Sequence, residues 1–520
     1  MTDAAKPDTD ADAHARAHAE AEAHAHAASK ADAKAASKEA GIYVYSRLAA
    51  SLLMLGVLAV IGRTCTKEER GYIVALLTVY ETAVALGSLG LADVVLYYVG
   101  RTPEKAAHIV RQASLLLLIV SVPAIAIACI AGELSFGLGS ALPWLAIGLL
   151  LELPTQPAVN QLLAVRRAGL ASALYIGFAF FRPIAVLIPV LTGMGLQWIP
   201  VFVACLSITR LLAHVTIVRR IFTIPTHEPP RAWLTKHALR DMFFFALPAG
   251  MAVLGGKLNP QIDKYVVGLF YDETALGLYG FAAWELPLVT MIPYAIGAVM
   301  QARYAKMFHE GKYEPMRQLW LATIRKTEVL VLPLAMMFIA LAEEAMVLMF
   351  GPEQRAAAPI FQIFTLTMLQ RVTAYGPMLQ SIGETRSLLV TSTLLLATNL
   401  ILSYPFTMWF GMNGAAIATV VASVPPLAFT LWRISRGLRT TIGGVMPWGH
   451  YLGTLALSAS LAFVLWWLRD YLPGGPGAKL GLGAAAYIVS FFVLARAVRL
   501  VSSDDVRYLT DWLSLKMLRK

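Results

Sequence analysis

The stretch ASLLLLIVSVPAIAIACIA, from Ala113 to Ala131, decides the fold class because none of its residues carries a charge. The hydrocarbon core of a bilayer is about 30 Å thick, and a helix crosses it with about 20 apolar residues. Stretches of this kind recur from Ile42 to Arg499. The sequence therefore predicts an all-α polytopic membrane protein.

The composition leads to the same conclusion. Of the 520 residues, 58% are apolar and 14% are charged, and the mean hydropathy is +0.64. Soluble domains carry about 25% charged residues. The formal net charge of +11 is interpreted as a topological signal, since Lys and Arg are retained on the cytoplasmic side of a membrane. No nucleic acid partner is expected.

We predict about fourteen spans in two six-span lobes, followed by two extra C-terminal spans. The spans are expected at residues 42–62, 71–92, 113–131, 141–163, 169–190, 197–217, 243–269, 278–300, 327–350, 358–381, 388–409, 413–432, 446–468 and 480–498. The predicted parts are a disordered Ala- and His-rich tail (1–40), a first lobe (41–217), a cytoplasmic linker (218–242), a second lobe (243–436), the extra spans (446–500) and an interfacial tail helix (501–520).

The distribution of basic residues predicts the orientation. With the N-terminus inside, the inner loops and the C-terminal tail contain 26 Lys and Arg, and the outer loops contain six. This asymmetry predicts that both termini are cytoplasmic. In the absence of a cleavable signal peptide, we expect a multi-pass protein of the bacterial inner membrane.

A short repeated pattern links the two lobes. Gly62 and Gly71 are nine residues apart and join the first two spans, and Gly268 and Gly277 have the same spacing in the second lobe. A tyrosine follows the second glycine of each pair closely. Such a pattern indicates the internal repeat that many transporters contain.

Five bases lie within predicted spans, where a charge is costly unless it faces a cavity or a partner. Arg182, Lys257, Lys264 and Arg371 come from both lobes and predict a cationic cavity between them. Cations in a low-dielectric cleft suit a pyrophosphate. Arg210 lies nearer to the end of its span, and we expect it to extend towards the interface.

The seventh span carries the densest set of candidate residues. Lys257 and Lys264 are two turns apart, so they share one face of the helix, about 10 Å apart along the axis. Asn259 and Pro260 stand between them, and a proline removes a helical hydrogen bond. We therefore expect a helix break at Asn259 and Pro260.

Acidic residues in or near the spans offer two alternatives. Glu81, Asp93, Asp263 and Glu285 are candidates for ion pairing with the embedded bases, or for binding a coupling H⁺ or Na⁺. Asp263 directly precedes Lys264, so the two side chains point about 100° apart on the helix. The remaining acids of this kind are Glu152, Glu343 and Glu344.

No motif for catalysis or metal binding is present in the sequence. It contains no GxxxxGK[ST] phosphate loop, HExxH pair or CxxC set, so neither ATP hydrolysis nor a metal centre is indicated. We expect no enzyme activity and no cofactor.

Several short motifs resemble those of the polysaccharide-flippase branch of the multidrug/oligosaccharidyl-lipid/polysaccharide exporter superfamily, which includes the O-antigen repeat-unit flippases. They occur in order from residue 42 to residue 436. The motifs are Tyr45-Ser46-Arg47-Leu48, Glu69-Arg70-Gly71-Tyr72, Gly87-Ser88-Leu89-Gly90-Leu91-Ala92-Asp93, Gln261-Ile262-Asp263-Lys264-Tyr265, Ala275-Leu276-Gly277-Leu278-Tyr279, Gly383-Glu384-Thr385-Arg386, Asn399 and Gly411-Met412-Asn413-Gly414-Ala415-Ala416-Ile417-Ala418-Thr419.

The resemblance implies a V-shaped bundle that works by alternating access and binds an undecaprenyl-pyrophosphate-linked glycan in a central cationic cavity. Arg47, Asp263 and Lys264 match family positions, which adds Arg47 to the candidate substrate-binding residues. The implied partners are the lipid-linked glycan, the bilayer and a polysaccharide polymerase or chain-length complex. Fourteen spans differ from the twelve of many repeat-unit flippases, which leaves a lipid II-type flippase open.

Two further alternatives remain open at this stage. A cation-coupled multidrug exporter of the same superfamily would need an acidic or apolar cavity, and the embedded bases argue against it. A membrane glycosyl- or acyltransferase, or a scaffold without transport activity, would need no such cavity.

Overall fold

A computed structural model describes residues 49–223, 236–283 and 286–501. Throughout these ranges the ordered elements are helices, without strands. Seven helices are long and apolar enough to cross a membrane, or nine if each of two sharply bent pairs forms one span. The predicted number of fourteen spans stays a prediction. The N-terminal tail, the C-terminal tail helix, Arg47 and Glu285 lie outside the described residues.

The first half of the molecule consists of residues 49–221. Its helices are Ala49–Thr64, α2 (Lys67–Ser88), α3 (Leu91–Arg101), α4 (Ala106–Phe136), α5 (Ala141–Glu152), α6 (Ala158–Ala164), α7 (Ala168–Thr192) and α8 (Ile199–Ile221). A short 3-10 helix, η2 (Leu153–Thr155), joins α5 to α6.

The second half consists of residues 236–437, and two more helices follow it. Its helices are α9 (Lys236–Phe270), α10 (Glu273–Ala282), α11 (Pro287–His309), α12 (Tyr313–Ala340), α13 (Ala342–Phe350), α14 (Ala358–Leu366), α15 (Tyr375–Ser381), α16 (Thr385–Ala422) and α17 (Val424–Gly437), and the additional pair is α18 (Trp448–Leu468) and α19 (Pro476–Ala497). The interval between α8 and α9 is shorter than the predicted linker because both helices extend into it.

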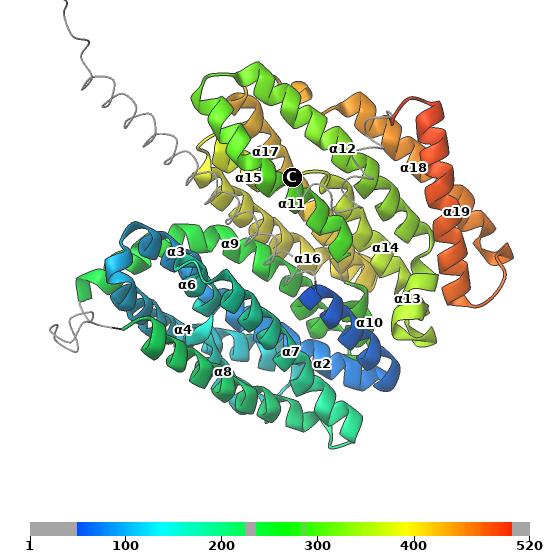
Figure 1. The fold of residues 1–520 in the computed structure, drawn as a ribbon. Coiled ribbons are helices and arrows are strands. Elements are labelled where there is room, and N and C mark those ends of the chain that lie inside the picture. Colours follow the sequence, from blue (N-terminus) through cyan, green and yellow to red (C-terminus); the bar gives the residue numbers. More distant parts are fainter. Residues whose placement is uncertain (1–48, 224–235, 284–285, 502–520) are drawn as a thin grey trace, which may run out of the picture.

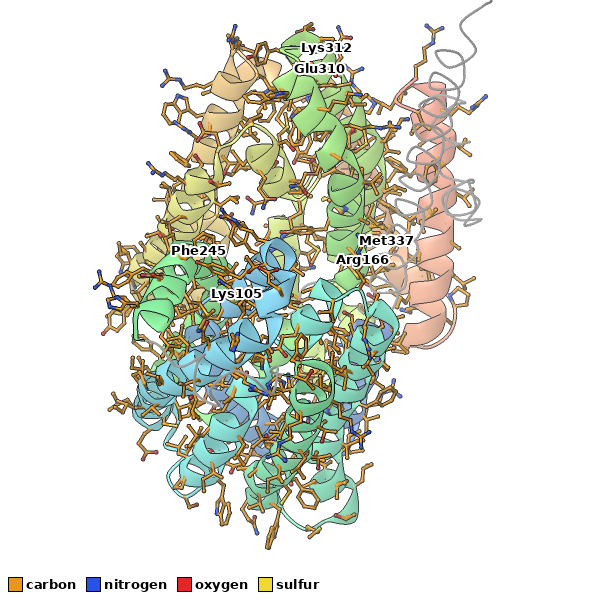
Figure 2. The ribbon with its side chains drawn as sticks, turned by 60° about the vertical axis from the view of Figure 1, so that its left-hand side comes forward. Lys105, Arg166, Phe245, Glu310, Lys312 and Met337 are labelled. Carbon is orange, nitrogen blue, oxygen red and sulfur yellow. The ribbon has the colours of Figure 1, made fainter. Side chains whose placement is uncertain are left out.

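Figure 1 shows the two halves as two helical bundles, with α9, α10 and α16 where they meet. Figure 2 labels bases on three helix connections: Lys105 before α4 and Arg166 between α6 and α7 in the first half, and Lys312 beside Glu310 between α11 and α12 in the second. Lys312 Nζ lies 2.8 Å from Glu310 Oε2. We call the end that carries these connections the base-rich end.

Corresponding spans are interrupted in both halves. In the first half, Leu89 and Gly90 separate α2 from α3, and η2 separates α5 from α6. In the second half, α10 ends at Ala282 and α11 begins at Pro287, and residues 367–374 separate α14 from α15. Non-helical backbone at membrane depth is tolerated where protein or a polar cavity surrounds it.

The glycines of the repeated sequence pattern bring the two halves together at the opposite end. A Cβ on Gly71 would overlap the carbonyl oxygen of Glu273, and one on Gly277 would lie 2.8 Å from the carbonyl oxygen of Lys67. Only glycine therefore allows α2 and α10 to pack this closely. We call this region, built around the α2 and α10 N-termini, the closed end.

The outer glycines of the pattern make matching contacts. A Cβ on Gly62 would lie 2.9 Å from Cβ of Phe350, the last residue of α13, and one on Gly268 would collide with the ring of Phe136, the last residue of α4. Each half thus receives an aromatic ring from the other half at an equivalent glycine. This reciprocity is what an internal repeat requires.

Candidate functional site

A cavity of about 580 Å³ lies at the middle of the first-half helices. Its walls come from helix 49–64 and from α2, α5, α6, α7, α8 and α9, together with residues beside η2. The lining residues are Ala50, Ser51, Met54, Tyr80, Val84, Ser88, Gly90, Glu152, Gln156, Val159, Asn160, Tyr175, Phe178, Ala179, Pro183, Ala185, Val203, Leu206, Ser207, Arg210, Val253 and Lys257. Most of these positions are far from the helix ends, so the cavity lies at mid-depth.

An ion pair forms the polar wall of this cavity. Arg210 of α8 donates through Nη1 to Oε1 of Glu152, and the Tyr80 hydroxyl of α2 donates to the same oxygen. Gln156 Nε2 approaches that oxygen at 3.5 Å. The Arg210 guanidinium also stacks over the Phe178 ring of α7, 4.4 Å from its centroid.

The break in the α5–α6 span explains how Glu152 reaches the cavity. Glu152 is the last residue of α5, and Pro154 and Pro157 follow it. A proline interrupts the regular hydrogen-bond pattern of a helix. The carboxylate is only 5% exposed, so its charge needs the partners that α2 and α8 supply.

This arrangement corrects the prediction for Arg210. We expected its side chain to extend towards the interface, but it turns inwards and pairs with Glu152. Opposite charges attract strongly where water is scarce, and the stacking on Phe178 supports the same orientation. The sequence contains one available signal, an embedded acid and an embedded base in the same half, but it cannot show that their helices are neighbours.

Lys257 brings a base from the second half to the same cavity. Its Nζ donates to Ser88 Oγ at the end of α2, 3.3 Å away. The helix α9 reaches this position by bending 56° between Pro248 and Gly250. A Cβ on Gly250 would overlap the carbonyl oxygen of Leu89, so the bend presses α9 against the interruption between α2 and α3.

Lys264 faces α2 as well, but nearer to the closed end. Its Nζ donates to Gln261 Oε1 at 3.2 Å, and Glu81 of α2 attracts it electrostatically. The contacts of Lys257 and Lys264 with α2 agree with their predicted common face. Lys264 does not line the cavity, and Asp263 and Glu81 interact with it electrostatically.

Asp263 faces α10 rather than the cavity. Its Oδ2 accepts a 2.8 Å hydrogen bond from the Tyr279 hydroxyl, and Oδ1 accepts from the backbone N–H of Lys264 at 3.0 Å. The side chain is 1% exposed. These bonds hold α9 and α10 together next to the closed end.

The predicted helix break at Asn259 and Pro260 is wrong. The segment Gly250–Phe270 continues through both residues, and the bend of this span lies at Pro248 instead. Packing explains the continuity, since a Cβ on Gly255 would collide with the backbone of Ser392 in α16. The close contact with α16 holds this part of α9 in place.

Asn259 belongs to a neutral polar cluster instead. Asn399 of α16 donates through Nδ2 to the Asn259 carbonyl at 3.3 Å, and Ser403 and Thr419 donate to Asn399 Oδ1 at 3.0 and 3.4 Å. All four residues are buried. We refer to Asn259, Asn399, Ser403 and Thr419 as the amide cluster.

The other predicted site residues lie apart from this geometry. Arg371 is half-buried in the interruption between α14 and α15, and its backbone N–H donates to the Met368 carbonyl at 2.9 Å. It is absent from the cavity lining. Arg182 precedes the cavity-lining Pro183, but its side chain and that of Asp93 lie outside the described part of the structure.

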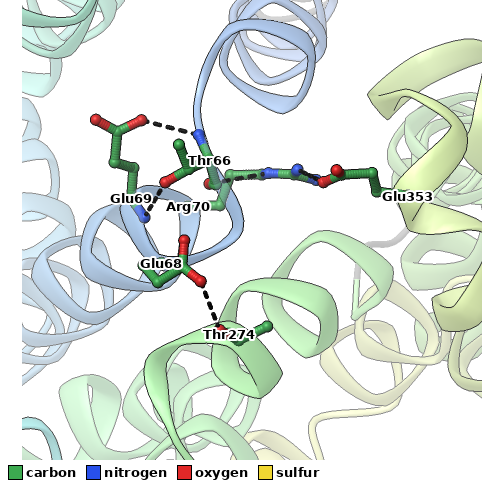
Figure 3. A network of polar contacts seen from close by, with 6 residues as sticks. All are labelled: Thr66, Glu68, Glu69, Arg70, Thr274 and Glu353. Atoms are coloured by element: carbon green, nitrogen blue, oxygen red, sulfur yellow. Dashed lines mark hydrogen bonds and ion pairs between the residues drawn. The ribbon is translucent and has the colours of Figure 1, made fainter.

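Charged contacts strengthen the closed end (Figure 3). Arg70 of α2 is 3% exposed and pairs with Glu353 of the second half at 2.5 Å. Thr274 at the start of α10 donates to Glu68 Oε1 at 3.3 Å. Thr66 caps α2 by accepting from the Glu69 N–H, and Glu69 accepts from the Thr66 N–H. The cap fixes the α2 end that carries Arg70.

Within residues 49–223, 236–283 and 286–501, no group of three His, Cys, Asp or Glu side chains is arranged to hold a metal ion. The geometry instead offers a cavity with bases from both halves, a paired acid and neutral hydrogen-bonding groups.

Comparison with known proteins identifies the family. The model of the family described as "Polysaccharide biosynthesis protein" matches residues 60–359, which is more than half of the chain. The chain belongs to this family. The branch of the exporter superfamily predicted from the sequence motifs is therefore confirmed.

Individual relatives are more distant. The chain is 23% identical over 186 residues to Agl15 of Haloferax volcanii, a protein named as a probable low-salt glycan biosynthesis flippase, and the match covers 35% of this chain and 39% of that protein. The aligned part is thus well under half of this relative's length.

Solved structures share the fold. The lipid II flippase MurJ, in an inward closed conformation, superposes with a TM-score of 0.65 at 14% identity, covering 88% of this chain and 99% of MurJ. An inward-facing multidrug resistance MATE transporter of the same superfamily gives 0.57 at 16% identity, with coverages of 77% and 100%. This polysaccharide biosynthesis family member is a multi-pass membrane protein with the helical fold of that superfamily.

Proposed function

We propose that the protein flips an undecaprenyl-pyrophosphate-linked oligosaccharide repeat unit from the cytoplasmic to the outer leaflet of the bacterial inner membrane. The observation that carries this proposal is the mid-depth cavity, which receives Arg210 from the first half and Lys257 from the second. A site shared by two repeat-related halves can open to either side when the halves rock against each other.

The lining of the cavity suits both parts of the headgroup. Arg and Lys bind phosphate oxygens through charge-assisted hydrogen bonds. Gln156, Asn160 and Tyr175 offer amide and hydroxyl groups for sugar hydroxyls, next to the apolar Phe178 ring. The prenyl chain would stay in the lipid, so only the polar headgroup crosses through protein.

The base-rich end is proposed to face the cytoplasm, with both termini on that side, because Lys and Arg are retained there. The closed end then faces the outer leaflet. In this orientation the described conformation seals the outer side, and transport requires the contacts around Gly71 and Arg70 to separate.

The comparisons support a glycan rather than a drug as the cargo. The family is named for polysaccharide biosynthesis, and the relatives include proteins named as a glycan biosynthesis flippase and a lipid II flippase. The charged residues known to line the cavity are Arg210, Lys257 and Glu152, and their net positive charge disfavours cationic drugs.

A reconstituted flipping assay tests the proposal. Lipid-linked repeat unit is incorporated into vesicles with the purified protein, and its accessibility to an impermeant enzyme is followed over time. We expect Lys257→Gln to slow flipping about tenfold or more, because a charge-assisted bond in a cavity is worth about 1.5–3 kcal/mol.

Lys479→Gln is the matched control, since this lysine lies on α19, away from the cavity, with Asp470 4.0 Å away. Unchanged flipping by Lys257→Gln would contradict the cavity assignment. If the protein flipped lipid II and not the oligosaccharide repeat unit, its cargo would be lipid II. If it conferred resistance to cationic dyes, it would be a multidrug exporter.

A further inference from the structure

The Glu152–Arg210 pair has a feature that a purely structural ion pair does not need. It forms part of the cavity wall, so an anion that enters the cavity meets Arg210 directly. Arg210 Nε is buried and has no hydrogen-bond partner among the described residues. The guanidinium therefore keeps donor capacity, and its stacking on Phe178 holds it in place.

The charges in the cavity do not match the proposed cargo. Arg210 and Lys257 supply two positive charges and Glu152 supplies one negative charge among the lining residues described. A pyrophosphate linked to a prenyl group and to a sugar carries one negative charge on each phosphoryl group. Binding would leave an excess negative charge, which is costly in a low-dielectric site.

A proton on Glu152 removes this excess. When a phosphoryl oxygen accepts from Arg210, the carboxylate loses its counter-charge while it stays largely buried, and burial then favours its neutral form. The proton comes from water at the open side and binds a carboxylate oxygen, and no covalent bond of the substrate changes. Tyr80 remains as a hydrogen-bond partner for the neutral carboxyl group.

We propose that Glu152 takes up one proton when the pyrophosphate of the cargo displaces it from Arg210, so that cargo binding and proton binding are linked. This inference rests on the proposed function and adds the residue at which proton binding is linked to cargo binding. Glu152 is not among the coupling acids predicted from the sequence. Two of those predicted acids have other neighbours: Asp263 accepts from Tyr279, and Glu81 interacts with Lys264.

The titratable groups around the pair come from four helices. Tyr80 of α2 and Arg210 of α8 contact Glu152, while Tyr175 of α7 and Lys257 of α9 line the same cavity. One turn beyond Arg210 on α8, His214 is close enough to interact with it electrostatically, and its Nε2 lies 3.1 Å from Ser114 Oγ. The experiment must therefore distinguish protonation of Glu152 from protonation of these neighbouring groups.

The experiment measures binding of farnesyl-pyrophosphoryl-N-acetylglucosamine to the purified full-length protein in nanodiscs. Isothermal titration calorimetry in buffers of different ionisation enthalpy gives the number of protons taken up. We expect about one proton per bound molecule, and a Kd that rises about tenfold per pH unit where the bound state holds the proton and the free state does not.

Glu152→Gln should bind the same molecule without proton uptake, with a Kd that changes less than about twofold over that pH range. Glu344→Gln is the matched control, because Glu344 is a buried acid of α13 that does not line the cavity, and its proton uptake should equal that of the wild type. Melting curves verify that each variant is folded.

Tyr80→Phe gives a second test if Glu152→Gln does not fold. Without the hydroxyl that stabilises the carboxylate, the pH-dependent range should move to higher pH. Binding without proton uptake in the wild type, or unchanged uptake in Glu152→Gln, overturns the proposal and leaves the flippase function intact. Absence of binding in every variant and at every pH would instead contradict the proposed function.

Discussion

The two halves of the molecule share a skeleton of interrupted spans and glycine contacts, but they differ in the groups that they bury. Both have interrupted spans at equivalent places, and both place a glycine under an aromatic ring of the other half, at Gly62 and at Gly268. The first half, however, surrounds a cavity with the Glu152–Arg210 pair. The second half instead buries the neutral amide cluster around Asn399.

The two halves thus have similar packing contacts, whereas only the first half has the charged cavity. The glycine contacts depend on backbone geometry, which both halves keep, because two repeats that close against each other need matching surfaces. The charged cavity needs only one site. We therefore expect mutations in the shared skeleton to change the conformational equilibrium, and mutations in the first-half cavity to change binding.

The largest effect is expected for Gly71→Val, which disrupts a glycine contact of the shared skeleton. The new side chain would overlap the Glu273 carbonyl, and overpacking of this kind costs about 1–3 kcal/mol. Cys65 lies buried next to this contact, and burial raises the pKa of its thiol. Maleimide labelling of Cys65, in a Cys129→Ala and Cys205→Ala background, should accelerate about 5- to 100-fold.

Gly56→Val serves as the control for this prediction, because a Cβ at Gly56 meets nothing within 4 Å. It should leave Cys65 as slow to react as in the parent protein. Equal labelling of Cys65 in the Gly71 and Gly56 variants would show that the closed end does not depend on this glycine.

A smaller effect, on stability alone, is expected for Asn399→Leu in the amide cluster. The substitution removes the acceptor of the Ser403 and Thr419 hydroxyls. Loss of buried hydrogen bonds should lower the free energy of unfolding by about 1–3 kcal/mol, measurable by thermal unfolding of the purified protein. If Asn399→Leu lost flipping activity while its stability was unchanged, the amide cluster would take part in transport. That result would contradict the proposed difference between the two halves.

Glu353→Gln should loosen the closed end mildly. Its partner Arg70 is almost fully buried, but the Glu353 side chain is 50% exposed, so water screens the pair and its contribution is about 1 kcal/mol or less. Labelling of Cys65 should accelerate up to about fivefold. Glu310→Gln, at the base-rich end, should not affect it.

The smallest effect is expected for Tyr451→Phe, which touches only the second half. The Tyr451 hydroxyl of α18 donates at 2.8 Å to the carbonyl of Leu369, which lies in the interruption between α14 and α15. Its loss should cost about 0.5 kcal/mol of stability without altering Cys65 labelling. Tyr471→Phe is a suitable control, because Tyr471 is 76% exposed.

Features that depend on local sequence were predictable, and those that depend on helix neighbours were not. Apolar length predicted the helical membrane fold, and the glycine spacing pointed to positions where the two halves pack closely, because both patterns are local features of the chain. The common face of Lys257 and Lys264 followed from helical periodicity. Their partners on α2, Ser88 and Glu81, did not follow from it, because these residues lie more than 160 positions earlier in the chain.

The wrong predictions have the same origin. Pro260 is as strong a local signal for a break as Pro248, but the packing of Gly255 against α16 keeps the helix continuous at one proline, and the contact of Gly250 with Leu89 accompanies the bend at the other. Likewise, Arg210 turns inwards only because Glu152 and Phe178 come from neighbouring helices. The roles of Arg182, Lys264 and Arg371 in binding stay predictions.

The added pair of helices has a practical consequence. Helix α18 packs against α12, and α19 packs against α12, α13 and α18; the pair is tied to the second half at one end by His450 and Glu328 and at the other by Arg469 and Glu343. We therefore expect them to move together with the second half. A spectroscopic label in the loop at residues 472–475 would follow the position of the second half. The distance from this label to one on α8 would measure the movement of the two halves relative to each other, without altering the cavity.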